Sequence, residues 1–265
     1  RADAGKEKVA AAFVFTVGCR DLPALQETGE RAFGYDIWTK YNTTEPVVEA
    51  RYEGELNPDM KAKITELGKT DPKAAQELYR SVSYHVDHGN GLDCYKVGPT
   101  LGGGTTALMA GDTIIYPYCY ATQEILDNGP LRFTVKLVYN QLVVKGDSTI
   151  IETRIITLDA GSYCNKTVVS YTNLKETMPL AVGIVLHEPD GAIVADAANG
   201  YMTYVDPTDN AGGDNGKIFV GAAFPTLVKE AKAVLFPEKE KKELRGGADG
   251  HVLAISEYEP GADFS

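Results

Sequence analysis

From Leu131 onward, apolar residues recur at every second position of the chain. In LRFTVKLVY, residues 131–139, four apolar side chains fall on one strand face and three polar ones on the other. Successive side chains of a strand point to opposite faces, so this alternation is typical of a strand with one buried face. The turn Lys145–Gly146–Asp147 leads into STIIETRIITL, where Glu152 and Arg154 share a face. The two segments together predict an antiparallel hairpin.

Turn sequences recur along the rest of the chain and separate further runs of strand length. They are DAGS (159–162), EPDG (188–191), ANG (198–200), DNG (214–216) and ADG (248–250). This spacing, with hardly any helix between the turns, predicts a mostly β fold, an antiparallel sandwich with consecutive strands through residues 130–225. The apolar run at 9–18 is also interpreted as a strand.

Short helices are expected mainly in the N-terminal third. NPDMKAKITELG (57–68) opens with a capping Asn57 and Pro58, and DPKAAQELYRSV (71–82) repeats the device with Asp71 and Pro72. We expect Gly68 to end the first of these helices. The charged stretch at 237–250 is interpreted as a solvated helix or loop. We therefore expect one mostly β domain over residues 1–265.

Charge and cysteine spacing exclude several classes of function. The formal net charge is −11 and the pI is about 4.9, which disfavours nucleic acid and anionic membrane surfaces as partners. No apolar window is long enough to span a bilayer. The N-terminal RADAGKEK lacks the pattern of a signal peptide, so we expect any leader to have been removed. The four cysteines have no zinc or redox spacing; we expect buried thiols, or a disulfide in an oxidising compartment.

The segment 83–98, SYHVDHGNGLDCYKVG, concentrates groups that can do chemistry. It holds Tyr84, His85, Asp87, His88, Asp93, Tyr95 and Lys96. His85 and His88 would face opposite sides of an extended strand, so a shared site requires the glycine turn at 89–91 to fold back. The histidines could act as acid and base or hold the loop together. A divalent metal held by the histidines and aspartates is the less favoured alternative.

Other candidate groups lie on predicted strands or at their ends. His187 and Glu188 follow the apolar run LAVGIVL, and His251 opens HVLAISEY; a lone histidine is more often structural than catalytic. Tyr116, Tyr118 and Tyr120 would share one strand face, either to stack on sugar rings or to fill the core. Arg132, Lys136 and Arg154 would pair with Glu124 and Glu152 across strands, or an arginine would neutralise a substrate carboxylate.

Several blocks of the chain resemble a known family. GERAFGYDIWTKYN, HVDHGNGLDCYKVGPTLGGG, YPYCYATQEILDNGPLRFTVKLVYN, ETRIITLDAGSYCNKTVVSYTNL and AVGIVLHEPDG are similar to the domain-of-unknown-function family 4861, over about residues 28–258. The resemblance implies a galactose-mutarotase-like β-supersandwich. It also implies a periplasmic or extracellular protein of polysaccharide-degrading bacteria. Against the family pattern, this chain would be shortened at both ends.

Our first functional hypothesis is an enzyme acting on uronic-acid-containing oligosaccharides by proton abstraction and elimination, as a lyase or dehydratase. His85 or His88 would be the base, Tyr95 or Tyr84 the acid, and Arg132 or Arg154 the neutralising cation. The alternatives are a mutarotase or epimerase using His187 and Glu188, and a non-catalytic carbohydrate-binding module with a tyrosine platform. The expected partner is an oligosaccharide or polysaccharide, and no cofactor is expected. The oligomeric state is left open.

Overall fold

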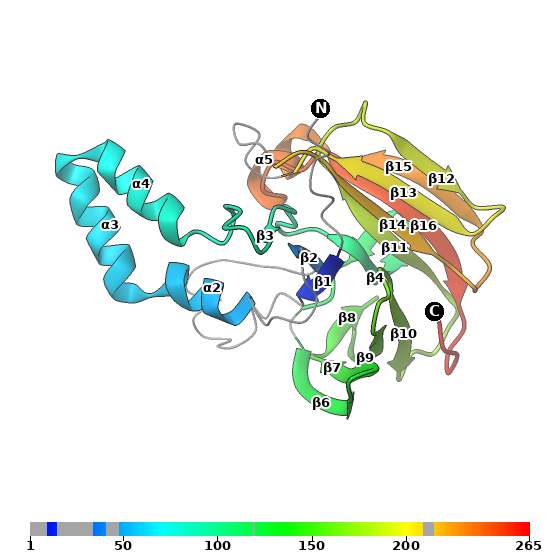
Figure 1. The fold of residues 1–265 in the computed structure, drawn as a ribbon. Coiled ribbons are helices and arrows are strands. Elements are labelled where there is room, and N and C mark those ends of the chain that lie inside the picture. Colours follow the sequence, from blue (N-terminus) through cyan, green and yellow to red (C-terminus); the bar gives the residue numbers. More distant parts are fainter. Residues whose placement is uncertain (1–9, 15–33, 41–47, 119, 209–214) are drawn as a thin grey trace, which may run out of the picture. The chain divides into compact units, whose positions relative to one another are not determined.

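A computed structural model describes residues 10–14, 34–40, 48–118, 120–208 and 215–265. Contacts within the chain divide it into two compact units. Unit 1 consists mainly of residues 37–95, and unit 2 mainly of residues 96–207 and 217–265. Helices dominate unit 1 and strands dominate unit 2 (Figure 1).

Unit 1 holds three helices and a small three-stranded sheet, in which β2 and β3 pair antiparallel. The helices are α2 (Val48–Leu56), α3 (Pro58–Thr70) and α4 (Pro72–Val82). The sheet has the order β1-β2-β3, with β1 at Ala10–Val14, β2 at Asp36–Lys40 and β3 at Leu92–Asp93. β1 confirms the central part of the strand predicted at 9–18, and residues 15–18 lie outside the described part.

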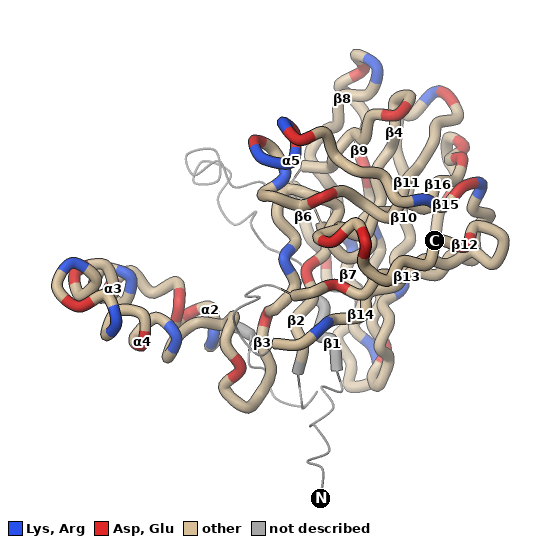
Figure 2. The backbone as a smooth tube through the Cα atoms, turned by 90° about the horizontal axis from the view of Figure 1, so that it is seen from above, with Lys and Arg blue, Asp and Glu red and all other residues tan. Residues whose placement is uncertain are grey.

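The capping residues predicted for α3 and α4 are confirmed. Asn57 Oδ1 accepts hydrogen bonds from the backbone N of Asp59 and Met60 at 2.9 and 3.0 Å, and Asp71 Oδ1 accepts from Ala74 N at 3.0 Å. The expected end of α3 at Gly68 is wrong, because the helix continues to Thr70 and is capped by Asp71. We did not predict α2, which opens without an Asn-Pro or Asp-Pro pair. Charges of both signs are interspersed along α3 and α4 (Figure 2).

Replacing Asn57 with alanine should destabilise the start of α3 by about 1 kcal/mol, because two backbone N–H groups lose their acceptor. The local measurement is amide hydrogen exchange, which should accelerate at Asp59 and Met60. Lys63→Ala, on an exposed position of the same helix, is the control and should leave both amides unchanged. Unaltered exchange in the Asn57 variant would show that this cap does not stabilise the helix.

Unit 2 contains thirteen described strands and one short helix. They are β4 (Gly103–Ala110), β5 (Thr113–Ile115), β6 (Tyr120–Asn128), β7 (Arg132–Tyr139), β8 (Leu142–Val144), β9 (Asp147–Asp159), β10 (Asn165–Thr172), β11 (Met178–Leu186), β12 (Ile193–Asp196), β13 (Tyr201–Asp206), β14 (Ile218–Ala223), β15 (Glu230–Leu235), α5 (Glu238–Leu244) and β16 (Gly250–Tyr258).

The strands of unit 2 form three sheets whose neighbouring strands all pair antiparallel. One sheet has the order β10-β9-β7-β6 with β8 beside β9, the second β15-β16-β11-β4-β5, and the third β12-β13-β14. Mostly antiparallel β structure with few, short helices is therefore confirmed, including the consecutive strands predicted through residues 130–225.

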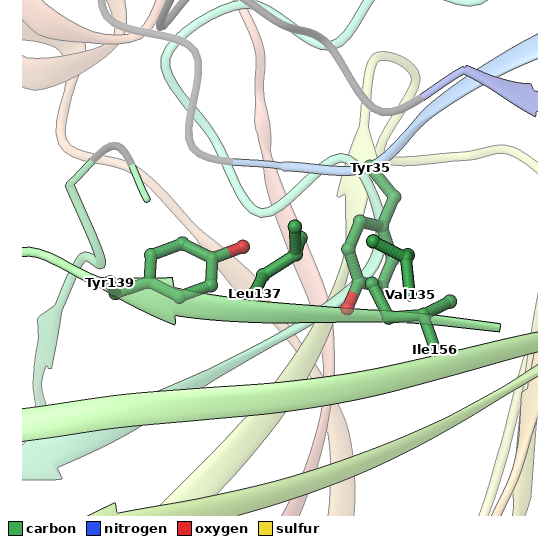
Figure 3. Packing of buried hydrophobic residues seen from close by; sticks show 5 residues of the cluster. All are labelled: Tyr35, Val135, Leu137, Tyr139 and Ile156. Atoms are coloured by element: carbon green, nitrogen blue, oxygen red, sulfur yellow. The ribbon is translucent and has the colours of Figure 1, made fainter. Parts of the chain in front are cut away.

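Two five-stranded sheets meet through their inner faces. Tyr171 N of β10 donates to Tyr258 OH of β16 at 2.9 Å, and Arg154 Nη2 of β9 donates to Thr106 O of β4 at 3.2 Å. Apolar packing accompanies these bonds: a buried cluster holds Tyr35, Val135, Leu137, Tyr139 and Ile156 (Figure 3). The predicted alternation of β7 is confirmed for Phe133, Val135 and Leu137, which all belong to this packing. Leu131 lies before β7 and is exposed, contrary to the prediction.

Three further sequence predictions have structural outcomes. Tyr116 and Tyr118 lie between β5 and β6 while Tyr120 begins β6, so the expected single strand face is wrong: the chain leaves the sheet between them. The charged stretch at 237–250 does contain a helix without buried residues, α5. Cys94 is buried and Cys164 is exposed, and the other two cysteines lie outside the described residues.

Candidate functional site

In unit 1, residues 83–95, here called the histidine loop, fold back through hydrogen bonds between the two imidazoles and the backbone of the same segment. His85 Nδ1 lies 3.0 Å from Asp93 O, and His88 Nε2 lies 2.9 Å from Ser83 O. Because a carbonyl oxygen only accepts, both of these ring nitrogens carry a proton. Gly89 and Gly91 have φ values of 89° and 107°, which provide the predicted turn. Each imidazole therefore ties two parts of the loop together.

The remaining predicted residues of this segment have different environments. Tyr84 packs 4.2 Å from His85 between ring centroids, and Asp87 Oδ1 accepts from Gly89 N at 2.8 Å. Asp93 and Tyr95 are buried, and Lys96 is exposed. Among the residues with described positions, no three histidine, cysteine or carboxylate groups come together as a metal site would require. The catalytic and binding roles assigned to this loop stay predictions.

In unit 2, His187 forms a close pair with a carboxylate that the sequence did not indicate. His187 Nδ1 lies 2.6 Å from Asp206 Oδ2, and the Asp206 side chain is fully buried whereas that of His187 is 14% exposed. The carboxylate accepts the Nδ1 proton, so Nε2 of the neutral ring carries the lone pair. No described residue forms a hydrogen bond with Nε2. This is the arrangement of a histidine base held in one tautomer by an aspartate.

The ends of two strands position this pair. β11 is buried along almost its whole length and ends at Leu186, so that His187 is the first residue beyond it. In β13 every second side chain is buried, which places Met202, Tyr204 and Asp206 on one face. Tyr204 OH accepts hydrogen bonds from the backbone N of His187 at 3.2 Å and of Glu188 at 2.9 Å. Tyr204 thereby fixes the backbone from which His187 projects, and Glu188 is exposed beside it.

His251 is buried inside unit 2, where its ring bonds and packs against other residues of the fold. Its Nε2 accepts a hydrogen bond from Leu101 N at 3.0 Å, and its ring packs 4.9 Å from Phe236 between centroids. Burial, together with the charge of Arg245, lowers the pKa of His251 from 6.5 to about 3. The imidazole is therefore neutral at ordinary pH and uses its lone pair within the fold.

Arg245 covers one of the tyrosines proposed as a sugar platform. Its guanidinium carbon lies 4.0 Å from the centroid of the Tyr116 ring, and it also bonds Glu240 and the carbonyl of Pro99. Burial raises the pKa of Tyr116 to about 12. Tyr116 is thus a protonated, half-buried residue with one ring face occupied, and Tyr118 is half-buried nearby in sequence.

Both candidate arginines already have carboxylate partners. Arg132 binds Asp159 at 2.5 and 3.0 Å on the surface, and the register pairs Lys136 with Glu124. Arg154 and Glu152 form a fully buried ion pair. Burial lowers the pKa of Arg154, but the Glu152 carboxylate and the nearby tyrosines together outweigh this, and the pKa is well above its ordinary value. The predicted shared face of Glu152 and Arg154 is confirmed.

Comparison with known proteins shows which family the chain belongs to. The sequence profile described as "Domain of unknown function (DUF4861)" matches residues 20–265. The chain belongs to this family. The "Uncharacterized protein P7" of Formosa agariphila is 29% identical over 121 residues, which cover 46% of this chain and 30% of the relative. No solved structure matches the chain. In the part of this DUF4861 chain that is described, no helix is long and apolar enough to cross a membrane.

Sequence reasoning missed Asp206 and Tyr204 in this DUF4861 chain. The signal was present in YMTYVD, because an acidic residue continues an alternation that buries Met202 and Tyr204. A carboxylate on a buried face needs a partner. That partner lies 19 positions earlier in the chain, and no short motif joins the two.

The buried His251 should make the protein less stable in mild acid. The unfolded chain binds a proton at this histidine below pH 6.5, while the folded chain does not until about pH 3. Its stabilising contribution is therefore complete above pH 6.5 and is lost as the pH falls, by about 2 kcal/mol between pH 8 and pH 5. Urea unfolding of the wild type and of His251→Gln across this range measures the difference. Parallel stability curves for the two proteins would contradict it.

Proposed function

We propose that the chain is a carbohydrate-active enzyme that uses His187 as a base on oligosaccharides containing uronic acids, as a lyase or dehydratase. The observation that carries this proposal is the 2.6 Å contact between His187 Nδ1 and the buried Asp206. The family resemblance to proteins of polysaccharide-degrading bacteria supports the substrate class. We also propose a galactose-mutarotase-like supersandwich, which the two facing five-stranded sheets of unit 2 support, and a periplasmic or extracellular location.

The chemistry assigned to the pair is proton abstraction. Nε2 of His187 takes the proton on the carbon next to the uronate carboxylate. The electrons of that C–H bond form a carbon–carbon double bond, and the oxygen substituent on the neighbouring carbon leaves and takes a proton from water. Asp206 stabilises the imidazolium that results, as the carboxylate of a catalytic triad does. No cofactor takes part in this scheme.

His187 suits this role better than the loop histidines do. The rings of His85 and His88 bond neutral backbone carbonyls, whereas His187 faces a carboxylate. A carboxylate at Nδ1 holds the ring in the tautomer whose Nε2 has the lone pair, as in a catalytic triad. Metal binding by the histidine loop remains the less favoured proposal, with two imidazoles as its ligands.

Two other functions make different demands on the same residues. A mutarotase or epimerase would also use His187, with the exposed Glu188 as a second acid–base group. A binding module would need an open aromatic platform. Tyr116 does not provide one, because Arg245 covers its ring.

The test is incubation of the purified chain with a panel of saturated and unsaturated uronate oligosaccharides. A lyase increases the absorbance of a conjugated double bond, and a dehydratase releases one water that mass spectrometry detects. Either result, abolished by His187→Gln, is expected. A change of anomer or epimer ratio without a new double bond would replace elimination with the mutarotase or epimerase function. Binding without any conversion would establish the binding module and overturn the enzyme proposal.

A further inference from the structure

Four polar side-chain atoms in the interior of unit 2 make no hydrogen bond of good geometry, although the Tyr171 hydroxyl lies close enough to the Glu152 and Thr106 side chains to interact with them. They are Thr106 Oγ1 on β4, Glu152 Oε2 and Arg154 Nη1 on β9, and Tyr171 OH on β10. In the described ranges, the one other such atom is Trp38 Nε1 in unit 1. Nearly all buried polar groups in folded proteins are paired with protein or with ordered water. Four unpaired atoms on three neighbouring elements therefore indicate a common partner.

The four atoms belong to side chains that contact one another. Arg154 Nε donates to Glu152 Oε1, and Arg154 Nη2 donates to Thr106 O at 3.2 Å. Tyr171 lies directly opposite Glu152 in the pairing of β10 with β9. Each of these side chains thus presents one unpaired atom to the same region between the two five-stranded sheets.

Aromatic rings enclose this region. The guanidinium carbon of Arg154 lies 4.4 Å from the ring centroid of Tyr139 and 5.3 Å from that of Tyr35. Figure 3 shows these two tyrosines in the apolar cluster beside β7. Arg154 and Glu152 are 0% exposed. A partner of the four atoms must therefore be small and separated from bulk solvent.

Charge and hydrogen-bonding capacity define the chemistry of the partner of these four atoms. The charges of Arg154 and Glu152 cancel, so an ion in this region would be left uncompensated. Arg154 Nη1 only donates, Glu152 Oε2 only accepts, and the two hydroxyls can do either. Burial raises the pKa of Tyr171 well above its ordinary value, so its hydroxyl keeps its proton. The partner must both donate and accept.

We propose that Thr106, Glu152, Arg154 and Tyr171 bind ordered water inside the sandwich of unit 2. Water is neutral, both donates and accepts, and fits sites that offer two to four polar partners. It completes the hydrogen bonds of the buried ion pair and bridges β4, β9 and β10. Arg154 is then part of an internal polar network, which leaves it unavailable to neutralise a substrate carboxylate.

A high-resolution crystal structure of the whole chain tests the proposal directly. We expect at least one well-ordered water within hydrogen-bond distance of two or more of the four atoms. Direct bonds among the four side chains with no water between them would overturn the proposal. So would an ion in the site.

Stability measurements of hydroxyl-deletion variants give an independent test. Tyr171→Phe and Thr106→Val each remove one partner of the water, and each should lower the melting temperature by roughly 2–4 °C. If these hydroxyls were unpaired, deleting them would leave the melting temperature unchanged or raise it, and the proposal would fail. Tyr163→Phe is the matched control, because Tyr163 is 63% exposed and its hydroxyl is hydrated from bulk solvent.

Discussion

Replacing His187 with glutamine should lower kcat/KM on a converted uronate oligosaccharide by about 10²–10⁴-fold, the contribution typical of a positioned acid–base group. Glutamine retains a polar side chain but has no lone-pair nitrogen that can take a proton. Asp206→Asn should lower kcat/KM in the same direction, because the amide no longer stabilises the imidazolium. Steady-state kinetics on the same oligosaccharide measures both effects.

Two comparisons make this result interpretable. Asp196→Asn changes a half-buried aspartate at the end of β12, whose carboxylate binds Asn199, and should leave kcat/KM unchanged. His85→Gln and His88→Gln test the loop histidines predicted from the sequence. If they abolish turnover while His187→Gln retains it, the base lies in the histidine loop and our assignment is wrong.

Replacing Arg154 with methionine should destabilise the protein by about 3–5 kcal/mol, because the Glu152 carboxylate is then buried without its cation. Both side chains of this pair are fully enclosed, so solvent cannot take the place of the lost partner. The shift of the urea unfolding midpoint, combined with the slope of the transition, measures the change.

The double variant Glu152→Leu with Arg154→Met should recover much of this loss, because it removes both charges together. Arg132→Met is the matched control: it breaks the pair with Asp159, which is exposed on both sides, and should change stability little. An Arg154 variant as stable as the Arg132 variant would show that the buried charge is accommodated in another way.

The strand pattern and the helix caps could be predicted because they depend on neighbours in sequence. The alternation around Val135 and Leu137 reports a strand with one buried face, and Asn57 and Asp71 bond amides two or three residues away. The end of α3 was predicted wrongly, although it too depends on residues that are close in sequence. Glycine is common after a helix, but here Asp71, three residues beyond Gly68, caps α3 and begins α4.

The partners of the candidate site residues could not be predicted, because they depend on how strands pair and stack. His187 meets Asp206 across two strand ends, and Leu101 meets His251 over 150 positions of sequence. Arg154 was predicted on a polar strand face, yet that face is the inner one. Its pairing with Glu152, two positions earlier on the same strand, compensates its burial. A period-two pattern identifies faces but does not say which one is covered.

Each of the chain's four histidines has a different hydrogen-bond partner. His85 and His88 face the carbonyls of Asp93 and Ser83, His187 faces a carboxylate, and His251 accepts from Leu101 N. Imidazole nitrogens that carry a proton and those that carry a lone pair resonate far apart in nitrogen NMR spectra. Selective ¹⁵N labelling of histidine would therefore give a small set of resolvable signals, one group from each region of the fold. Those signals would follow the proposed substrate binding at His187 and the loop hydrogen bonds of His85 and His88 in a single sample.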